Sequence, residues 1–288
     1  FIRNVKIIGT GSFVPEQVYT NEFLEKKVNT NSEWIVQNLG IKERRIAFEN
    51  QSTSDLASEA ALKAIQNANL NADVIDLIIV ATATPDRLAP STACIVQDKI
   101  KAYNSVCFDI SAVCSGFLYA MSVASQFISA GTYNNVLVIG ADTFSKITDW
   151  TRRDCVFFGD GAGAVVMSSG NVTEGFLAYR LYTDSSKDIF GFTIPGGGSE
   201  IPLNNKNLNE QYFQMDGKSV FNMATKALPK AINQVLIDTG LKIEDIDIMI
   251  PHQPSIRILQ KTAEIIGLPF EKVMTNMDKY ANTSGGTI

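Results

Sequence analysis

The sequence predicts an α/β protein built from two related halves. Strand-like apolar runs alternate with segments of helical periodicity, and one set of these segments recurs about 170 residues later. With 288 residues, of which 45% are apolar, the chain can bury a large core in one or two domains.

The expected elements follow one another in alternation. Strands are expected at residues 75–83, 106–110, 136–140, 164–168 and 246–251, and helices at 54–68 and 117–130. Because the strand runs are largely apolar rather than alternating, we expect sheets that are covered on both faces. The polar, Asn-rich stretch 199–211 is expected to form a surface loop between the halves.

The repeat consists of a helix, a short loop and a buried strand. Residues 61–66 and 74–79 of the first half are echoed by residues 228–233 and 245–250 of the second. Three elements in the same order make a chance match unlikely to explain the pattern. We therefore expect two α/β halves, residues 1–170 and 171–288, related by a pseudo-two-fold axis.

The echo extends to two candidate site residues. Strand 106–110 runs into Cys114, and a strand expected around 272–277 runs into Asn282. Under pseudo-two-fold symmetry these residues occupy equivalent turns near helix N-termini. They are expected to face a shared site.

Composition excludes several classes of function. The formal charge of −5 without basic runs argues against nucleic acid or an anionic membrane as partners. The first residues lack a signal peptide and no apolar run reaches the roughly 20 residues of a membrane span, so we expect a cytoplasmic protein.

The four cysteines show neither a disulfide framework nor metal-ligand spacing, and no metal is expected. The start at Phe1 and the stop at Ile288 within a motif suggest that residues are missing.

Cys114 is the candidate nucleophile. It follows a strand and precedes a long helix-capable run, where unpaired N–H groups and the helix dipole favour a thiolate and can hold an oxyanion. The other three cysteines lie within apolar segments and are interpreted as buried structural thiols.

His252 and Asn282 are the candidate partners of this nucleophile. His252 is the only histidine in the chain and follows an expected buried strand, where its side chain can be held rigidly. Asn282, by local sequence alone, is equally consistent with a turn or helix cap. The repeat favours a functional role.

Three glycine patterns do not indicate a nucleotide site. Gly9-Thr-Gly11 follows a strand but has neither a third glycine nor a helix after it, unlike a dinucleotide fingerprint. Residues 159–163 precede a strand and are expected to form a tight turn. Residues 196–198 are expected to form a flexible bend.

The order Cys, His, Asn also fits the spacing of papain-like cysteine hydrolases. The local sequence Ala-Val-Cys-Ser-Gly-Phe lacks their signature, however, and a duplicated α/β unit has no place in them. This class remains a distant alternative.

The chain more closely resembles β-ketoacyl-acyl carrier protein synthase III over essentially its whole length. The motifs that carry the resemblance are IGTGSFVP at 8–15, SEWIV at 32–36, ATATPD at 81–86 with PSTAC at 90–94, DISAVCSGF at 109–117, FGDGAGA at 158–164, HQPSIRI at 252–258 and NTSGG at 282–286. The resemblance implies a thiolase-like fold, with two pseudo-two-fold-related α/β halves in a layered αβαβα architecture.

The resemblance also implies an activity. Cys114 would accept an acyl group from acyl-CoA, and decarboxylative condensation with malonyl-acyl carrier protein would initiate fatty acid synthesis without a cofactor, with His252 and Asn282 as catalytic partners. A homodimer that binds acyl carrier protein is implied. A related synthase III-like enzyme of polyketide or other secondary metabolism is the alternative.

Further residues carry over from the family one by one. Trp34 and Arg152 match nucleotide contacts of coenzyme A, with Arg153 as an alternative to Arg152, and Arg257 matches a carrier-protein docking residue. The pantetheine-tunnel matches are Met215, Gly217 and Phe221. The pattern departs from the family at Asn38, where an arginine is common, and at Ser255, where an asparagine is usual.

The same resemblance leads to a prediction about the length of the acyl primer that is accepted. In the family, the loop after Pro85 crosses the dimer interface and closes the partner's acyl pocket, and small Ala89 stands near the position where a Phe can do so. We expect primers longer than acetyl to be accepted, unless Leu88 fills the space. The family's Gly-rich C-terminal segment is not present in this sequence.

Overall fold

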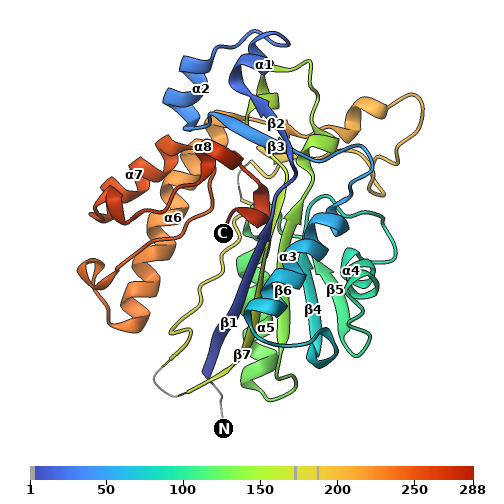
Figure 1. The fold of residues 1–288 in the computed structure, drawn as a ribbon. Helices are drawn as coiled ribbons and strands as arrows, with labels where there is room; N and C mark the ends of the chain where they lie inside the picture. The colour runs from blue at the N-terminus through green and yellow to red at the C-terminus, as the bar shows by residue number, and fades with distance from the viewer. Residues whose placement is uncertain (1–3, 172–173, 187) are drawn as a thin grey trace.

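The computed structural model describes residues 4–171, 174–186 and 188–288 (Figure 1). At its centre lies a five-stranded sheet with the order β1-β7-β6-β4-β5. The strands are β1 (Asn4–Phe13), β4 (Leu77–Ala81), β5 (Val106–Ile110), β6 (Val136–Asp142) and β7 (Gly161–Gly170). β4 pairs in parallel with β5 and β6, whereas β7 runs antiparallel to β1 and β6. The four strands predicted in the first half are confirmed.

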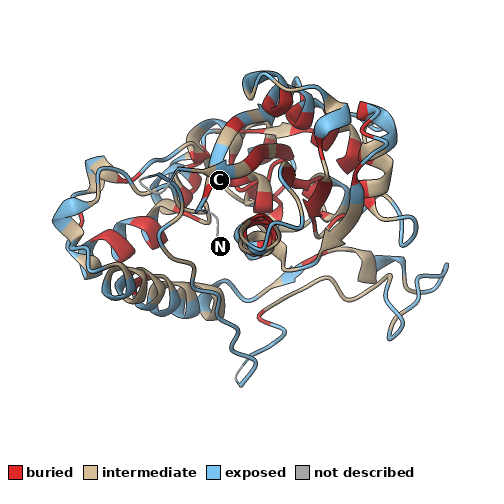
Figure 2. Ribbon diagram, turned by 90° about the horizontal axis from the view of Figure 1, so that it is seen from below, coloured by how far each residue is buried: buried red, intermediate tan, exposed pale blue. Residues whose placement is uncertain are grey.

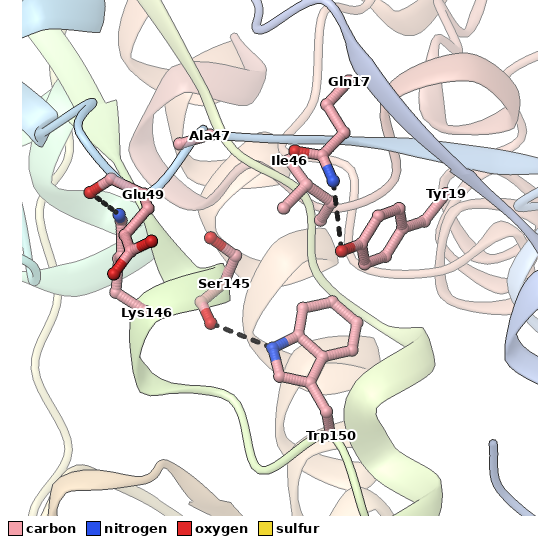
Figure 3. Close-up of a pocket in the computed structure, with 8 residues that line it drawn as sticks. All are labelled: Gln17, Tyr19, Ile46, Ala47, Glu49, Ser145, Lys146 and Trp150. Atoms are coloured by element: carbon pink, nitrogen blue, oxygen red, sulfur yellow. Dashed lines mark hydrogen bonds between the residues drawn. The ribbon is translucent and has the colours of Figure 1, made fainter.

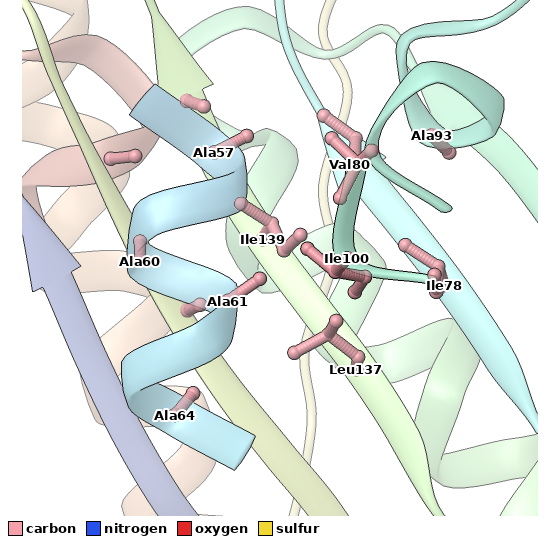
Figure 4. Close-up of a cluster of buried hydrophobic side chains, with 14 of the residues drawn as sticks. Ala57, Ala60, Ala61, Ala64, Ile78, Val80, Ala93, Ile100, Leu137 and Ile139 are labelled. Atoms are coloured by element: carbon pink, nitrogen blue, oxygen red, sulfur yellow. The ribbon is translucent and has the colours of Figure 1, made fainter. Parts of the chain in front are cut away.

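Helices cover both faces of this sheet, which explains why its central strands are apolar throughout. α3 (Thr53–Asn67) and α4 (Thr92–Ile100) pack on one face, and α5 (Gly116–Ser129) packs on the other. α3 presents a stripe of small alanines to the strands (Figure 4). The predicted helices are therefore confirmed within two residues at each end.

The Gly9-Thr-Gly11 pattern has a packing role. A Cβ atom at Gly9 would lie 2.3 Å from the backbone oxygen of Ala64, and one at Gly11 would lie 2.3 Å from that of Ala60. Both glycines let α3 approach β1 at backbone distance. This close contact explains the pattern without a nucleotide.

The other elements lie around this central unit. They are β2 (Gln17–Thr20), α1 (Asn21–Glu25), α2 (Ser32–Leu39), β3 (Glu43–Ile46), β8 (Phe192–Thr193), β9 (Gln214–Met215), α6 (Gly217–Thr239), α7 (Ile256–Ile266) and α8 (Met277–Tyr280). A separate apolar cluster joins α2, α7 and α8. The stretch 199–211 is largely loop and ends in a short 3₁₀ turn, Leu208–Gln211.

The strands expected at 246–251 and 272–277 do not form in the structure. Their only mutual pairing within the described residues is an isolated bridge between Met249 and Val273. Ile248 and Ile250 remain 54% and 50% exposed, so no sheet covers this apolar run. A strand needs a continuous ladder to a neighbour, and a single bridge supplies too few hydrogen bonds.

The long helix of the second half is also largely exposed. α6 has 23 residues, of which Pro229 alone is buried, and Figure 2 shows it mostly in the colours of intermediate and exposed residues. Within the described ranges, no helix combines the length and the apolar character needed to cross a bilayer.

Candidate active site

Cys114 lies between the end of β5 and the start of α5, as the sequence predicts. It belongs to a short 3₁₀ turn, Val113–Ser115, that leads directly into α5 at Gly116. A Cβ atom at Gly116 would lie 3.0 Å from the side chain of Ala81, so a glycine lets this turn sit close to β4. The partly buried thiol is thus held at the junction of a strand and a helix.

The turns that carry Cys114 and Asn282 share an unusual backbone. Val113, one residue before Cys114, has φ 47°, and Ala281, one residue before Asn282, has φ 56°. Left-handed φ is rare outside glycine and is a true outlier for a β-branched residue such as valine. Both turns are therefore strained at the residue that precedes the candidate site residue.

Asn282 is held against the loop before β7. Its backbone nitrogen donates to Phe157 O at 3.2 Å, and its backbone oxygen accepts from Gly159 N at 3.0 Å. The side-chain oxygen accepts from Ser284 N at 2.8 Å. These bonds fix the orientation of a nearly buried carboxamide, whose NH₂ end remains the part able to donate to a ligand.

His252 lies in the loop before α7 and reaches the same segment. Its Nδ1 lies 2.6 Å from the hydroxyl of Thr287, in the 3₁₀ turn Ser284–Thr287. The neighbouring Gln253 anchors this loop by donating to Pro251 O and to Met274 O. Burial lowers the pKa of His252 to about 4, so the imidazole is neutral at physiological pH.

The ionisation of Cys114 differs from the sequence expectation. Burial raises the pKa of the thiol to about 12; the nearby Ser284 side chain opposes this rise and Asp142 adds to it. The expected thiolate is therefore not the favoured form in the free site, because desolvation outweighs the helix N-terminus.

Glycines in two neighbouring strands allow the turn Ser284–Thr287 to pack directly on the sheet. Gly140 of β6 and Gly163 of β7 are paired in register. A Cβ atom at Gly140 would lie 2.3 Å from Gly285 O, and one at Gly163 would lie 3.3 Å from Gly286 O. Gly161 and Gly163 of FGDGAGA thus lie in β7, where Gly163 allows a close backbone approach, and do not form the expected tight turn.

The candidate nucleotide contacts fall on neighbouring elements. The guanidinium of Arg153, not that of Arg152, lies over the indole of Trp34, 4.4 Å from the ring centroid. Arg152 instead forms an ion pair with Asp154 and donates to Phe213 O. Asn38 donates to Trp34 O at 2.7 Å, and Ser255 caps α7 by accepting from Ile258 N.

The residues predicted to bind the rest of the substrate or the carrier protein belong to other elements than the Cys114 turn. Met215 ends β9, Gly217 begins α6, and Phe221 is a partly buried residue of α6. Arg257 is exposed on the first turn of α7, and Ala89 is exposed in the loop after β4. No group of three or more potential metal ligands occurs among the residues described.

Two hollows lie outside the Cys114 turn. One, of about 300 Å³, is lined by polar and aromatic residues of β2, of the stretch 46–49 and of the stretch 145–150, including Tyr19, Lys146 and Trp150 (Figure 3). Another, of about 780 Å³, lies between residues 85–88 and residues 197–203. Neither is lined by Cys114, His252 or Asn282.

Comparison with known proteins shows the family to which this chain is related. Residues 108–185 match the family model 3-oxoacyl-[acyl-carrier-protein (ACP)] synthase III, and residues 236–288 match its C-terminal model. The chain is 46% identical over 289 residues to β-ketoacyl-[acyl-carrier-protein] synthase III of Clostridium acetobutylicum, covering 100% of this chain and 88% of the relative. The chain belongs to the 3-oxoacyl-[acyl-carrier-protein] synthase III family.

Solved structures agree with the synthase III assignment. The crystal structure of 3-oxoacyl-[acyl-carrier-protein] synthase III from Aquifex aeolicus VF5 is 43% identical, with a TM-score of 0.90, over 99% of this chain and 88% of that one. The priming β-ketosynthase of the R1128 polyketide pathway is 26% identical, with a TM-score of 0.93, over 99% and 85%. The predicted thiolase-like fold is confirmed, and the papain-like alternative was wrong.

Sequence reasoning missed two residues of this synthase III site. Asp142 is the last residue of β6 and Ser284 follows Asn282 by two positions, and both are fully buried. Asp142 carried the same signal as His252, a polar residue at the end of a buried strand. Ser284 lay inside the NTSGG motif without a separate signal.

Proposed function

We propose that this chain is a β-ketoacyl-acyl carrier protein synthase III that loads an acyl group from acyl-CoA onto Cys114 and condenses it with malonyl-acyl carrier protein. The observation that carries the proposal is the convergence of three motifs. His252 and Asn282 contact Thr287 and Ser284 of the turn Ser284–Thr287. The backbone beside Cys114 lies against the same turn, since a Cβ atom at Gly285 would lie 3.7 Å from Val113 O. Family membership makes the chain an acyltransferase of the condensing type.

In the first step, the Cys114 sulfur attacks the thioester carbonyl of acyl-CoA. A sulfur–acyl bond forms at Cys114, the bond to the coenzyme A sulfur breaks, and the thiol proton ends on the released coenzyme A. One thioester replaces another, so the step is nearly balanced in free energy. N–H groups at the start of α5 are suited to hold the oxyanion.

In the second step, malonyl-acyl carrier protein loses carbon dioxide and the resulting carbanion attacks the acyl-Cys114 carbonyl. His252 and Asn282 act as neutral donors to the enolate oxygen. A neutral imidazole suits this role because its pKa of about 4 prevents protonation at neutral pH. The reaction requires no cofactor beyond its two thioester substrates.

The hydroxyl of Thr287 decides which proton His252 offers. This hydroxyl has one proton and lies 2.6 Å from His252 Nδ1 and 2.7 Å from Ser284 O. In the free site the hydroxyl donates to Ser284 O, because a carbonyl oxygen only accepts. If the hydroxyl turns its proton to Nδ1, then Nε2 carries a proton and donates, as the proposal requires. If it points to Ser284 O, then Nε2 is an acceptor and His252 is instead a base for the thiol.

The adenine of acyl-CoA is proposed to stack on Trp34, with Arg153 as the cationic partner. Their separation of 4.4 Å leaves no room for a base between them, so Arg153 must swing outward when the nucleotide binds. Met215, Gly217 and Phe221 remain the proposed lining of the pantetheine tunnel.

Carrier protein and a second subunit are the proposed partners. Arg257 is exposed on α7 and unobstructed for an acidic carrier surface. Leu88 is 90% exposed beside the hollow of about 780 Å³, which supports a homodimer in which this loop enters the neighbouring subunit. The two halves, residues 1–170 and 171–288, are proposed to meet at the Cys114 and Asn282 turns.

A priming role in secondary metabolism is the second candidate. The likeness to the priming β-ketosynthase of the R1128 polyketide pathway favours it, but at 26% identity against 46% for the Clostridium acetobutylicum relative. We therefore place the initiation of fatty acid synthesis first.

Intact-mass analysis tests the nucleophile. After incubation with acyl-CoA, the protein should gain one acyl mass, and the Cys114→Ala variant should gain none. A Cys155→Ala variant is the matched control, because Cys155 is a buried thiol in η4 (Arg153–Val156) and should not affect loading. An adduct that persists without Cys114 would move the chemistry elsewhere.

The roles of His252 and Asn282 are tested by separating the two steps. His252→Ala and Asn282→Ala should still acquire the acyl mass at Cys114 but form little condensation product from malonyl-acyl carrier protein. If His252→Ala loses loading and condensation together, the histidine activates the thiol instead.

A further inference from the structure

The two segments of the second half that were expected to be strands share one backbone rung. The nitrogen of Met249 donates to Lys272 O at 2.8 Å, and its oxygen accepts from Met274 N at 2.9 Å. In a parallel ladder the next residue to bond in this way lies two positions further along the chain, which is Pro251. It would donate to Met274 O and accept from Asn276 N. Proline has no N–H group, so the backbone cannot complete this rung.

The side chain of Gln253 makes both bonds of the missing rung. Its Nε2 donates to Met274 O at 3.1 Å, and its Oε1 accepts from Asn276 N at 3.0 Å. Nε2 also donates to Pro251 O at 3.0 Å. The two carbonyl oxygens only accept and the backbone N–H only donates, so these partners fix the orientation of the carboxamide. Gln253 is 2% exposed, and its polar atoms are buried with their hydrogen bonds made.

This side-chain rung joins the loop of His252 to the segment that leads to Asn282. His252 directly precedes Gln253 in the chain, and Asn276 directly precedes α8, which ends two residues before Asn282. His252 and Asn282 also both bond to the turn Ser284–Thr287. The contacts therefore close a ring, in which Gln253 provides one link and the turn provides the other.

We infer that Gln253 is a positioning residue: its carboxamide replaces the backbone rung that Pro251 lacks, and it thereby fixes His252 relative to the segment that carries Asn282. The inference rests on the proposed function only in giving His252 and Asn282 a shared task in condensation. Gln253 acts through its neighbour and not on the reacting atoms. The placement of the imidazole that it provides is a property of the free protein.

The imidazole signals of the full chain test this inference without any substrate. His252 is the only histidine in the sequence, so protein labelled with ¹⁵N in the histidine ring gives the NMR signals of one imidazole. Burial lowers the pKa of His252 to about 4, so the wild-type ring should stay neutral between pH 5 and 8. Gln253→Leu removes the rung and releases the loop. The titration midpoint should then rise by about one pH unit or more, because the ring becomes more exposed to water.

A backbone rescue distinguishes the rung from general packing. Pro251→Ala supplies an N–H group that can donate to Met274 O, and in the absence of Gln253 the oxygen of residue 251 is free to accept from Asn276 N. The double variant Pro251→Ala/Gln253→Leu should therefore regain most of the wild-type titration. Alanine adds no side-chain contact, so a loss due to packing alone would not be recovered.

Gln97→Leu is the matched control. Gln97 of α4 also donates its Nε2 to a backbone oxygen, that of Ser105, at 2.7 Å, and Ser105 directly precedes β5. This variant loses a comparable bond in the first half of the chain. It should lower the melting temperature and leave the signals of His252 at their wild-type positions.

The two proposed reaction steps supply a second readout. Gln253→Leu should form condensation product about tenfold more slowly, because a displaced donor loses much of its effect. Acyl loading should stay within about twofold of wild type, since His252 is proposed to act after loading. If Gln253→Leu does not fold, Gln253→Asn is measured in its place, because its shorter side chain cannot reach both partners.

Three results would overturn the inference. They are an unchanged imidazole midpoint in Gln253→Leu, a double variant that shifts as far as Gln253→Leu alone, and a wild-type ring that already titrates near its ordinary pKa. Because the imidazole measurement contains no acyl donor, its result is separate from any failure of acyl loading or condensation.

Discussion

The chemistry of individual side chains in this site is dominated by burial. The thiol of Cys114 and the imidazole of His252 both shift toward their neutral forms, with pKa values of about 12 and about 4. A neutral thiol and a neutral imidazole avoid the free-energy cost of two desolvated charges. These side chains then interact with their neighbours through hydrogen bonds.

The shifted pKa of His252 predicts a pH dependence of stability. In the unfolded chain the imidazole titrates at about 6.5, whereas the folded value is about 4. Between these values the unfolded state holds the additional proton, so the free energy of unfolding falls as pH falls from 6.5 to 4, by roughly 3 kcal/mol at most.

His252→Gln should remove this contribution. Urea unfolding followed by circular dichroism between pH 4 and 7 should show a shallower loss of stability for the variant than for wild type. Parallel curves for the two proteins would show that the folded imidazole titrates near its ordinary pKa.

The two arginines after Asp149 are expected to differ in function. Arg153→Ala should raise KM for acyl-CoA about fivefold with kcat nearly unchanged, because a stacked cation contributes to binding rather than to the reaction. Arg152→Ala should instead lower stability, since its guanidinium bonds to Asp154 and Phe213 O. Steady-state kinetics and thermal melting of both variants measure this; a KM effect confined to Arg152→Ala would reverse the assignment.

At the scale of elements, the site depends on backbone contacts that only glycine allows. β6 and β7 present Gly140 and Gly163 side by side, and the turn Ser284–Thr287 lies directly on them. Asn282 and Ser284 are positioned by this contact as much as by their own hydrogen bonds. The FGDGAGA motif therefore contributes to the site through β7, which lies directly against the turn Ser284–Thr287.

Gly140→Ala should disrupt the site more than the fold. Its new Cβ would lie 2.3 Å from Gly285 O, a contact that forces the turn away from the sheet. We expect a loss of roughly 2 kcal/mol in stability and a larger loss in condensation than in acyl loading. Gly198→Ala, where no atom lies within 4 Å, is the control and should leave melting temperature and both activities unchanged.

At the scale of the whole molecule, the two halves differ in how much of their apolar surface is buried. The first half encloses a sheet between helices, whereas in the second the apolar run 246–250 has a single bridge and α6 buries only Pro229 (Figure 2). The chain spans 88% of the length of the Clostridium acetobutylicum relative. Exposed Ile248 and Ile250 form part of an apolar surface on this half.

Primer choice belongs to this scale because the proposed acyl pocket involves two subunits. Ala89 is exposed in the single chain, and in the proposed homodimer it would limit the acyl pocket of the neighbouring subunit. Each additional buried methylene contributes about 0.8 kcal/mol, or roughly fourfold in binding, so donors longer than acetyl-CoA should acylate Cys114 preferentially. Competition among acyl-CoA donors of increasing length, read by intact mass, measures this.

Ala89→Phe is the matched variant for the primer prediction. It should shift the preference back toward acetyl without changing acetyl loading. Strict preference of the wild-type protein for acetyl-CoA would contradict an open pocket and leave the condensing activity in place.

The sequence by itself determined four strands and two helices of the first half, the fold through its motifs, and the candidacy of Cys114, His252 and Asn282. Periodicity reports burial of each segment, and a polar residue at the end of a buried strand reports a site, so both signals are local. Only the tertiary structure decided which arginine meets Trp34, that buried Asp142 bonds to the turn after Asn282, and that burial raises the pKa of the Cys114 thiol. These properties depend on residues distant in sequence and on desolvation, which no local pattern encodes. The strands expected at 246–251 and 272–277 failed for the same reason, because a strand is defined by its neighbours.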